Sequence, residues 1–150
     1  THKATGLAKN KIIGMGGALD SARFKYRLSE ALGCPASDVD GMVLAAHSDK
    51  GMLPLTRLAT RNGVPVSEYL SEERLNQVAE DTKVGGATLT GLLGTSAWYA
   101  PGAAVSELVK AIACRAKDCE FKSHYLRWVV NSSLRQGEQR GKRSKRKREE

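Results

Sequence analysis

The chain has 150 residues and a mass of 16.2 kDa, which is the size of one domain or of part of a larger protein. Its net charge of +8 is uneven, because residues 1–126 carry 15 basic and 13 acidic side chains whereas residues 127–150 carry 9 basic and 3 acidic ones. With 41% hydrophobic residues but no apolar run near the roughly 20 residues that a membrane-spanning helix needs, the composition excludes both disorder throughout residues 1–126 and a membrane span.

The N-terminal segment lacks the apolar stretch of a secretory signal, which favours a cytoplasmic protein. After a short apolar pair, Gly14, Gly16 and Leu19 approximate the G-x-G-x-x-G pattern of a dinucleotide-binding loop. Leu19 stands at the third glycine position, where a helix and a strand must pack closely. The favoured interpretation is therefore a glycine-rich turn that leads into a helix.

Residues 18–32 are predicted to form this helix. Its apolar side chains recur at helical spacing, and Gly33 followed by Pro35 ends it. Asp20 and Arg23 are three residues apart, so both are expected to project from one side of the helix near its start.

Short strands are predicted between residues 41 and 70. The apolar run 42–46 is short enough for a buried strand and delivers His47 at its end. A second run, 52–59, contains Pro54 and is expected at a sheet edge. The pair Asn62-Gly63 is typical of a tight turn between two further strands.

Two more helices are predicted, over residues 71–93 and 101–113. Ser71 suits the N-cap of the first, and Pro101 suits the first position of the second. The pair Gly85-Gly86 lowers the helix propensity of the first, so we expect a close contact there that compensates.

The composition changes after residue 113. Residues 114–135 are a divergent end that could include one strand, and residues 136–150 contain only polar residues and glycine. This last segment is expected to be a basic, disordered tail, which could contact nucleic acid only nonspecifically.

The cysteines indicate neither a disulfide framework nor a metal site. Cys34, Cys114 and Cys119 are an odd number without a framework spacing, so reduced thiols are expected. Cys114, Cys119 and His124 could suggest zinc, but structural zinc usually needs four ligands in close pairs and no second pair is present.

Asp20, Arg23 and His47 are candidate functional residues. A carboxylate that accepts the Nδ1 proton of an imidazole fixes its tautomer and raises its basicity, which leaves Nε2 for proton transfer. Arg23 could bind a substrate carboxylate through two hydrogen bonds. Because 27 positions separate Asp20 from His47, a surface ion pair and an ordinary histidine remain the alternative.

Three segments resemble the lactate/malate dehydrogenase family. Residues 13–24 (IGMGGALDSARF) are similar to the segment that opens the catalytic half of that family, and residues 38–55 are similar to its catalytic-histidine strand and loop. Residues 84–105 (VGGATLTGLLGTSAWYAPGAAV) resemble the prokaryotic, lactate-dehydrogenase-like malate dehydrogenases in particular. The resemblance runs nearly continuously from Thr5 to Ala113.

The resemblance implies a fold of the α+β class. Residues 1–113 would be a partial form of the family's C-terminal catalytic domain, with a small, mostly antiparallel sheet and long helices. It also implies the NAD-dependent interconversion of (S)-malate and oxaloacetate.

The resemblance further implies a role for four residues. His47 would accept a proton when malate is oxidised and donate one when oxaloacetate is reduced. Asp20 would orient His47 and stabilise its imidazolium. Arg23 would bind the C1 carboxylate of the substrate, and Ser96 would line the substrate pocket.

The chain departs from the family pattern at three places. The family's Gly-Gly-His-Gly-Asp-Thr segment reads AAHSDK over residues 45–50, so Ser48 could crowd the pocket and Lys50 adds a charge. The family's N-terminal, NAD-binding Rossmann half is absent from this sequence. Residues 127–150 keep no likeness to the family, as a frameshifted gene end would produce.

These departures lead to two expectations. The isolated chain is expected to be inactive, because nothing in it can hold the dinucleotide. The alternative is a non-catalytic interaction module that pairs with full-length malate dehydrogenase subunits through its glycine-containing long helix, residues 71–93. A homo-oligomer is the other partner expectation. In either case a contiguous apolar patch is expected on the surface that the missing half normally covers.

Overall fold

The computed structural model describes residues 2–8, 11–48 and 50–116. The chain divides into two compact units: residues 15–105 form the larger, and residues 1–14 with 106–150 form the smaller. The predicted basic tail and most of the divergent end, including Cys119 and His124, lie outside the described residues.

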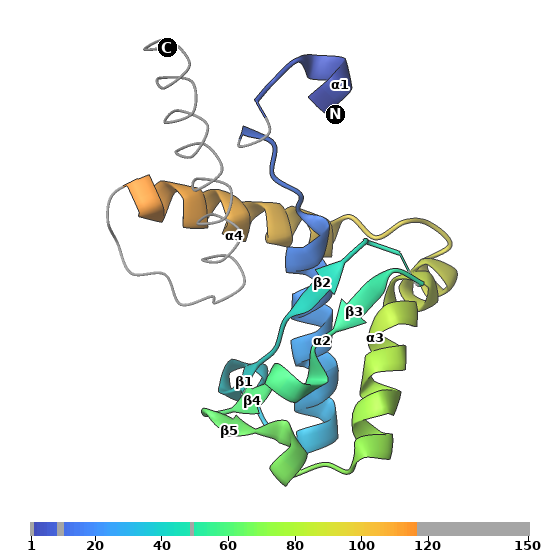
Figure 1. The fold of residues 1–150 in the computed structure, drawn as a ribbon. Helices are drawn as coiled ribbons and strands as arrows, with labels where there is room; N and C mark the ends of the chain where they lie inside the picture. The colour runs from blue at the N-terminus through green and yellow to red at the C-terminus, as the bar shows by residue number, and fades with distance from the viewer. Residues whose placement is uncertain (1, 9–10, 49, 117–150) are drawn as a thin grey trace, which may run out of the picture. The chain divides into compact units, whose positions relative to one another are not determined.

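Helix α2 (Gly16–Leu32) is the central element of the larger unit (Figure 1). Phe24 and Leu28 are fully buried on its apolar side, and each contributes about 1.5–3 kcal/mol relative to an exposed side chain. Gly33 ends the helix in the left-handed conformation with φ of 61°. The predicted helix and its stop are therefore confirmed, although the helix begins at Gly16.

The strands form two small antiparallel sheets. β2 (Val43–Ala45) pairs with β3 (Met52–Pro54), and β4 (Thr60–Arg61) lies between β1 (Val39–Asp40) and β5 (Val64–Pro65). The turn between β4 and β5 is the predicted one, with positive φ of 49° at Asn62 and 85° at Gly63. This combination is typical of the type I′ turns that join hairpin strands.

The expectation of one strand over residues 52–59 is wrong in its second half. Only Met52–Pro54 is extended, and Thr56–Leu58 form a 3-10 turn. Pro54 has no N–H to donate to a neighbouring strand, and the chain turns at Leu55, where ψ is 72°. This turn brings Ala59 into the core and Thr60 onto β1.

Helix α3 (Glu72–Leu93) packs alongside α2, and β3 contacts it from the sheet side (Figure 1). The predicted N-cap is confirmed, because the Arg74 N–H donates to Ser71 Oγ at 3.3 Å. α2, α3 and the two sheets enclose one apolar core. Its buried members are Phe24, Leu28, Val39, Val43, Met52, Ala59, Val66, Leu75 and Val78.

Helix α4 (Tyr99–Ala116) begins two residues before the predicted start. Pro101 is therefore not the first residue of the helix but the third. Proline is tolerated there, because the N–H groups of the first turn have no partner within a helix.

The smaller unit contains α1 (His2–Thr5) and the C-terminal part of α4, where Leu108 and Ala111 are buried. No helix in the described part of the chain is long and apolar enough to cross a membrane. Together, the helices and the small antiparallel sheets confirm the expected α+β class.

Candidate functional site

Asp20 and His47 form a hydrogen-bonded pair. Asp20 projects from the second turn of α2, and His47 lies just after β2, in the connection to β3. His47 Nδ1 lies 2.6 Å from Asp20 Oδ2, where the ring N–H donates to the carboxylate. The Asp20 side chain is only 2% exposed, whereas His47 is 54% exposed. The imidazole is therefore anchored from inside and open to solvent on its other side.

Asp20 has a second partner, Arg23, on its own helix. Arg23 Nη1 lies 3.4 Å from Asp20 Oδ1, so the two carboxylate oxygens serve two different side chains. Burial of an unpaired carboxylate would be very unfavourable, and this double pairing offsets it. No buried side-chain nitrogen or oxygen in the described part of the chain lacks a hydrogen-bond partner.

The face of α2 that carries Asp20 also carries other site residues. Gly16, Asp20 and Arg23 stand at positions i, i+4 and i+7, which fall on one stripe of an α-helix. Ser21, one residue away, points to the sheet instead, where its hydroxyl accepts the Val43 N–H at 3.0 Å. That bond fixes β2, and so the position of His47, against the same helix.

A cavity of about 290 Å³ opens beside this stripe, entirely within the larger unit. Three of the four predicted site residues line it, and Asp20 lies behind His47. The lining consists of Leu19, Arg23, His47, Ser48, Met52, Lys83, Gly86, Ala87, Thr90, Ser96, Ala97 and Pro101. Among its described lining residues, Arg23 and Lys83 are cations and none is an acid, and each cation is also paired with a carboxylate outside the lining, Asp20 or Glu80. Because guanidinium and ammonium groups have several N–H donors, both can still bind a ligand carboxylate.

Lys83 is a cavity residue that the sequence did not single out. Its ammonium lies 2.6 Å from Glu80 Oε1, an exposed carboxylate one helical turn away on α3. The sequence could have indicated it, because Lys83, Gly86 and Thr90 stand at positions i, i+3 and i+7 and therefore share one face of α3.

The close contact expected at Gly85-Gly86 exists at only one of the two glycines. A Cβ on Gly86 would lie 3.0 Å from Arg23 Nη1, whereas a Cβ on Gly85 would meet nothing within 4 Å. The neighbour is a guanidinium and not a backbone. Gly86 thus leaves room for Arg23 beside α3.

Two of the residues that depart from the family pattern at 45–50 lie differently relative to the cavity. Ser48 lines the cavity, and its hydroxyl accepts the Gly51 N–H at 3.1 Å, which ties it into the turn between β2 and β3. Lys50 is exposed and is not a lining residue.

The glycine-rich segment is not a dinucleotide cradle, and it is not the predicted turn either: residues 12–15 have no regular structure, and Gly16 and Gly17 already belong to α2. Residues 12–15 form no strand, and Leu19 is buried at the third glycine position. The pyrophosphate of a dinucleotide therefore has no strand–loop–helix site here. Among the described residues, no group of three or more His, Cys, Asp or Glu side chains could hold a metal ion.

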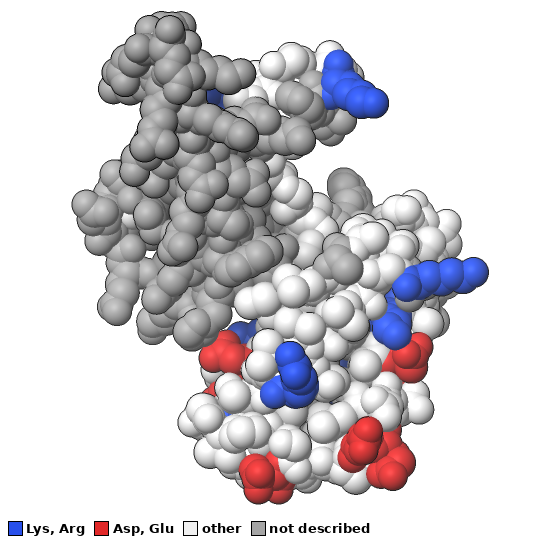
Figure 2. All heavy atoms as spheres, viewed as in Figure 1, with Lys and Arg blue, Asp and Glu red and all other residues white. Residues whose placement is uncertain are grey.

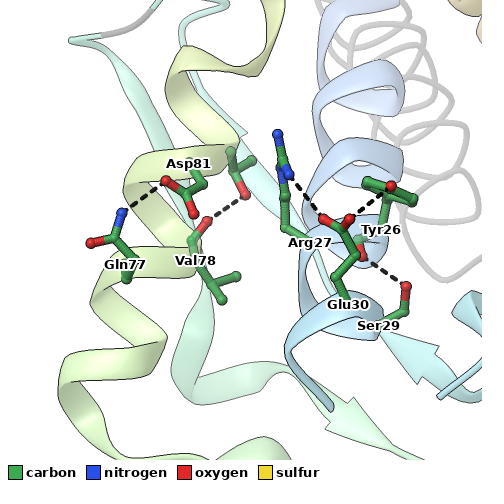
Figure 3. A network of polar contacts seen from close by, with 8 residues as sticks. Tyr26, Arg27, Ser29, Glu30, Gln77, Val78 and Asp81 are labelled. Carbon is green, nitrogen blue, oxygen red and sulfur yellow. Dashed lines mark hydrogen bonds and ion pairs between the residues drawn. The ribbon is translucent and has the colours of Figure 1, made fainter. Parts of the chain in front are cut away.

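Another polar cluster lies on the C-terminal half of α2 (Figure 3). The Tyr26 hydroxyl donates to Glu30 Oε1 at 2.8 Å, and Arg27 Nη1 donates to Glu30 Oε2 at 2.9 Å. The hydrogen bond from Tyr26, followed by that from Arg27, lowers the pKa of Glu30. The same bond to Glu30 raises the pKa of Tyr26.

Basic and acidic side chains are interspersed over the described residues on the face of the molecule that Figure 2 shows. The described residues on that face show no single-sign patch of the kind that binds nucleic acid. The excess positive charge belongs to residues 127–150, outside the described range.

Comparison with known proteins gives concordant results. A sequence profile of the lactate/malate dehydrogenase, alpha/beta C-terminal domain matches residues 17–130. Malate dehydrogenases from Bacteroides thetaiotaomicron and Flavobacterium johnsoniae are 66% and 67% identical over 110 residues, which are 73% of this chain and 35% of each relative. The chain thus spans about a third of the length of the curated relatives that it matches.

Solved structures give the same result. Malate dehydrogenase from Cryptosporidium parvum superposes with a TM-score of 0.71 at 37% identity, over 74% of this chain and 37% of that one. A lactate dehydrogenase from the same organism, complexed with lactic acid and nicotinamide adenine dinucleotide, gives a TM-score of 0.70 at 32% identity, over 74% and 37% of the two chains.

Proposed function

The chain belongs to the lactate/malate dehydrogenase family, within its C-terminal domain. We propose that it carries the acid–base and substrate-binding residues of a malate dehydrogenase active site. The reaction would be the NAD-dependent interconversion of (S)-malate and oxaloacetate. The observation that carries this proposal is the 2.6 Å contact between Asp20 and His47 at a cavity that Arg23 also lines.

His47 would be the acid–base group. Oxidation of a secondary alcohol removes a hydroxyl proton along with a hydride, and an imidazole Nε2 can accept that proton near neutral pH. Because Nδ1–H is already bonded to Asp20, Nε2 is the nitrogen that remains for the substrate. The buried carboxylate would then stabilise the imidazolium that forms.

Arg23 would bind the C1 carboxylate of the substrate, and Ser96 would line the pocket beside it. A guanidinium can pair with a carboxylate through two parallel hydrogen bonds, which fixes its orientation as well as its charge. Arg23 and Lys83 in the described cavity lining support an anionic substrate such as malate or oxaloacetate, because each has N–H donors beyond those that its own carboxylate partner takes.

NAD is the cofactor that the family implies, and it would supply the hydride acceptor. The similar lactate dehydrogenase from Cryptosporidium parvum carries this dinucleotide in its solved complex. The described residues of the present chain offer no cradle for its pyrophosphate, so the dinucleotide would depend on residues outside them. We therefore expect the 150-residue chain alone to be inactive.

Substrate binding tests the proposal directly. Malate added to the isotope-labelled chain should shift the NMR signals of the His47 ring, and Arg23→Gln should weaken binding about tenfold or more, because a charge-assisted pair is lost. Arg57→Gln, at an exposed arginine outside the cavity lining, is the matched control. Binding that Arg23→Gln leaves unchanged would contradict the assignment.

Turnover tests the expected inactivity. Oxaloacetate reduction, followed through NADH absorbance, should not exceed the rate of the His47→Ala variant. Turnover that His47→Ala abolishes would show that the chain can work alone.

A second candidate function is a non-catalytic interaction module. Three large apolar side chains around the end of α3 and the start of α4 favour it, because Leu92, Trp98 and Tyr99 are 81%, 71% and 81% exposed. The chain would form a homo-oligomer or pair with full-length malate dehydrogenase subunits. Co-purification with an intact malate dehydrogenase subunit supports this function, and strictly monomeric elution counts against it.

A further inference from the structure

The imidazole of His47 lies directly against the backbone of α2 at Gly16. A Cβ built on Gly16 would lie 2.9 Å from both His47 Cβ and His47 Cγ, and 3.2 Å from His47 Nδ1. Real Cβ atoms essentially never approach other heavy atoms within 3.0 Å. The contact atoms are the root of the histidine side chain and not a flexible tip, so a rotation of the terminal atoms alone cannot relieve it.

Gly16 and Asp20 hold the same ring from two places on one helix. They are four residues apart, so Asp20 lies one helical turn beyond Gly16 on the same face. Asp20 binds the ring through Nδ1, and the absence of a side chain at Gly16 leaves room for His47 Cβ, Cγ and Nδ1 beside the helix. Any side chain at position 16 would push the ring away from the helix and away from the Asp20 carboxylate.

Conformational freedom does not explain the glycine at this position. Gly16 is the first residue of α2, and its φ is not in the left-handed region. Alanine would also be the better helix former there. The requirement is therefore for space, and the three atoms nearest to a Cβ at this position all belong to the His47 side chain.

We infer that Gly16 is a positioning residue, which keeps the His47 imidazole seated on Asp20 in the Nδ1–H tautomer and so leaves Nε2 for proton transfer. The importance of Gly16 for the reaction rests on the proposed function. The structural content of the inference, the tautomer of His47, can be measured without turnover.

The test measures the ring nitrogens of His47 by NMR in the full 150-residue chain, at a pH where the imidazole is neutral. In the wild-type chain the ring should be predominantly the Nδ1–H tautomer. In Gly16→Ala the signals should shift toward the mixture of a free imidazole, in which Nε2–H is favoured, and toward those of Asp20→Asn. Gly85→Ala, at a helix glycine with open space around it, should match the wild type.

A double substitution keeps the inference testable if Gly16→Ala is poorly folded. His47→Gly removes the three atoms that would lie nearest to the new Cβ, including the two at 2.9 Å. Gly16→Ala should lower the thermal midpoint in the wild-type chain but raise it in the His47→Gly background, because there only the gain in helix propensity remains. Destabilisation of equal size in both backgrounds would overturn the inference.

The outcomes separate the inference from the proposed function. If the Asp20→Asn and wild-type rings differ but Gly16→Ala resembles the wild type, the role of Gly16 is wrong and the Asp20–His47 pair remains. If the wild-type ring already has the tautomer mixture of a free imidazole, the pair itself fails and the proposed function fails with it.

Discussion

One buried carboxylate organises the cavity. Asp20 joins the base candidate His47 to the anion-binding candidate Arg23, with one oxygen for each. The two outer side chains are held at a fixed separation because both are bonded to the same group. At the scale of single residues, the site therefore depends on the charge of Asp20 more than on its volume.

Asp20→Asn tests this dependence, because asparagine has nearly the same shape but no charge. We expect a loss of about 1–3 kcal/mol in the free energy of unfolding, since hydrogen bonds to a charged group are lost inside the protein. Urea denaturation measures it. Asp38→Asn, just before β1 and outside the cavity lining, should change the free energy far less, and equal losses would show that the charge of Asp20 is not special.

Lys83 should act on the second carboxylate of a dicarboxylate ligand. Lys83→Gln is expected to weaken malate binding about tenfold and lactate binding much less, because a charge-assisted hydrogen bond contributes at least about 1.5 kcal/mol. Lys110 provides a matched control, since it forms the same 2.6 Å pair with a glutamate three residues earlier. NMR titration compares the two ligands; equal weakening of both would contradict the role.

The sequence reveals some of these residues and not others for a physical reason. Asp20, Arg23, His47 and Ser96 lie in segments that resemble a known family, although spacing alone left an ordinary histidine open. Gly16 acquires its role only from its contact with His47, which lies 31 positions later in the chain. A contact between distant segments has no local pattern.

At the scale of elements, the long helices were predictable and the short strands were less so. α2 and α3 have an apolar period that repeats over several turns, and glycine or serine marks their ends. β3 has only three residues. That is too few for an alternation of apolar and polar side chains to show that the strand ends before the turn at Leu55. The start of α4 was misplaced because proline is permitted at more than one position of a first turn.

The cluster of Tyr26, Arg27 and Glu30 predicts a pH dependence within α2. The pKa of Glu30 is lowered in the folded chain, so its contribution to stability is present above the carboxyl's ordinary value and is lost as the pH falls through the folded value. The pKa of Tyr26 is raised, so its contribution is present below the phenol's ordinary value and is lost as the pH rises through the folded value.

Tyr26→Phe removes the shared hydrogen bond and should flatten both the acid and the alkaline limb of the stability curve. The effect should be small, because both side chains are exposed. Thermal midpoints measured from pH 3 to pH 11 would show it. Tyr69→Phe is the control, since the Tyr69 ring lies against Arg61 and keeps that contact without its hydroxyl. A Tyr26→Phe curve parallel to the wild type would refute the assignment.

At the scale of the whole molecule, most of the net positive charge lies beyond the part of the chain that the family profile covers. The family profile matches residues 17–130, whereas the excess of basic side chains lies in residues 127–150. Deletion of residues 136–150 should therefore abolish any nonspecific binding to duplex DNA at low salt, because the released counterions depend on these charges. Fluorescence anisotropy measures it, and binding that survives the deletion would exclude the tail as its cause.

The stripe on α2 has a consequence for how this site can change over evolution. An α-helix advances about 100° per residue, so one residue inserted between Gly16 and Arg23 would turn the site residues before the insertion about 100° away from those after it. An insertion in the turn after Gly33 would leave Gly16, Asp20 and Arg23 in phase. Related sequences should therefore differ in their side chains along α2 but not in the number of residues between these positions. The spacing along this one helix sets how Gly16, Asp20 and Arg23 lie relative to one another.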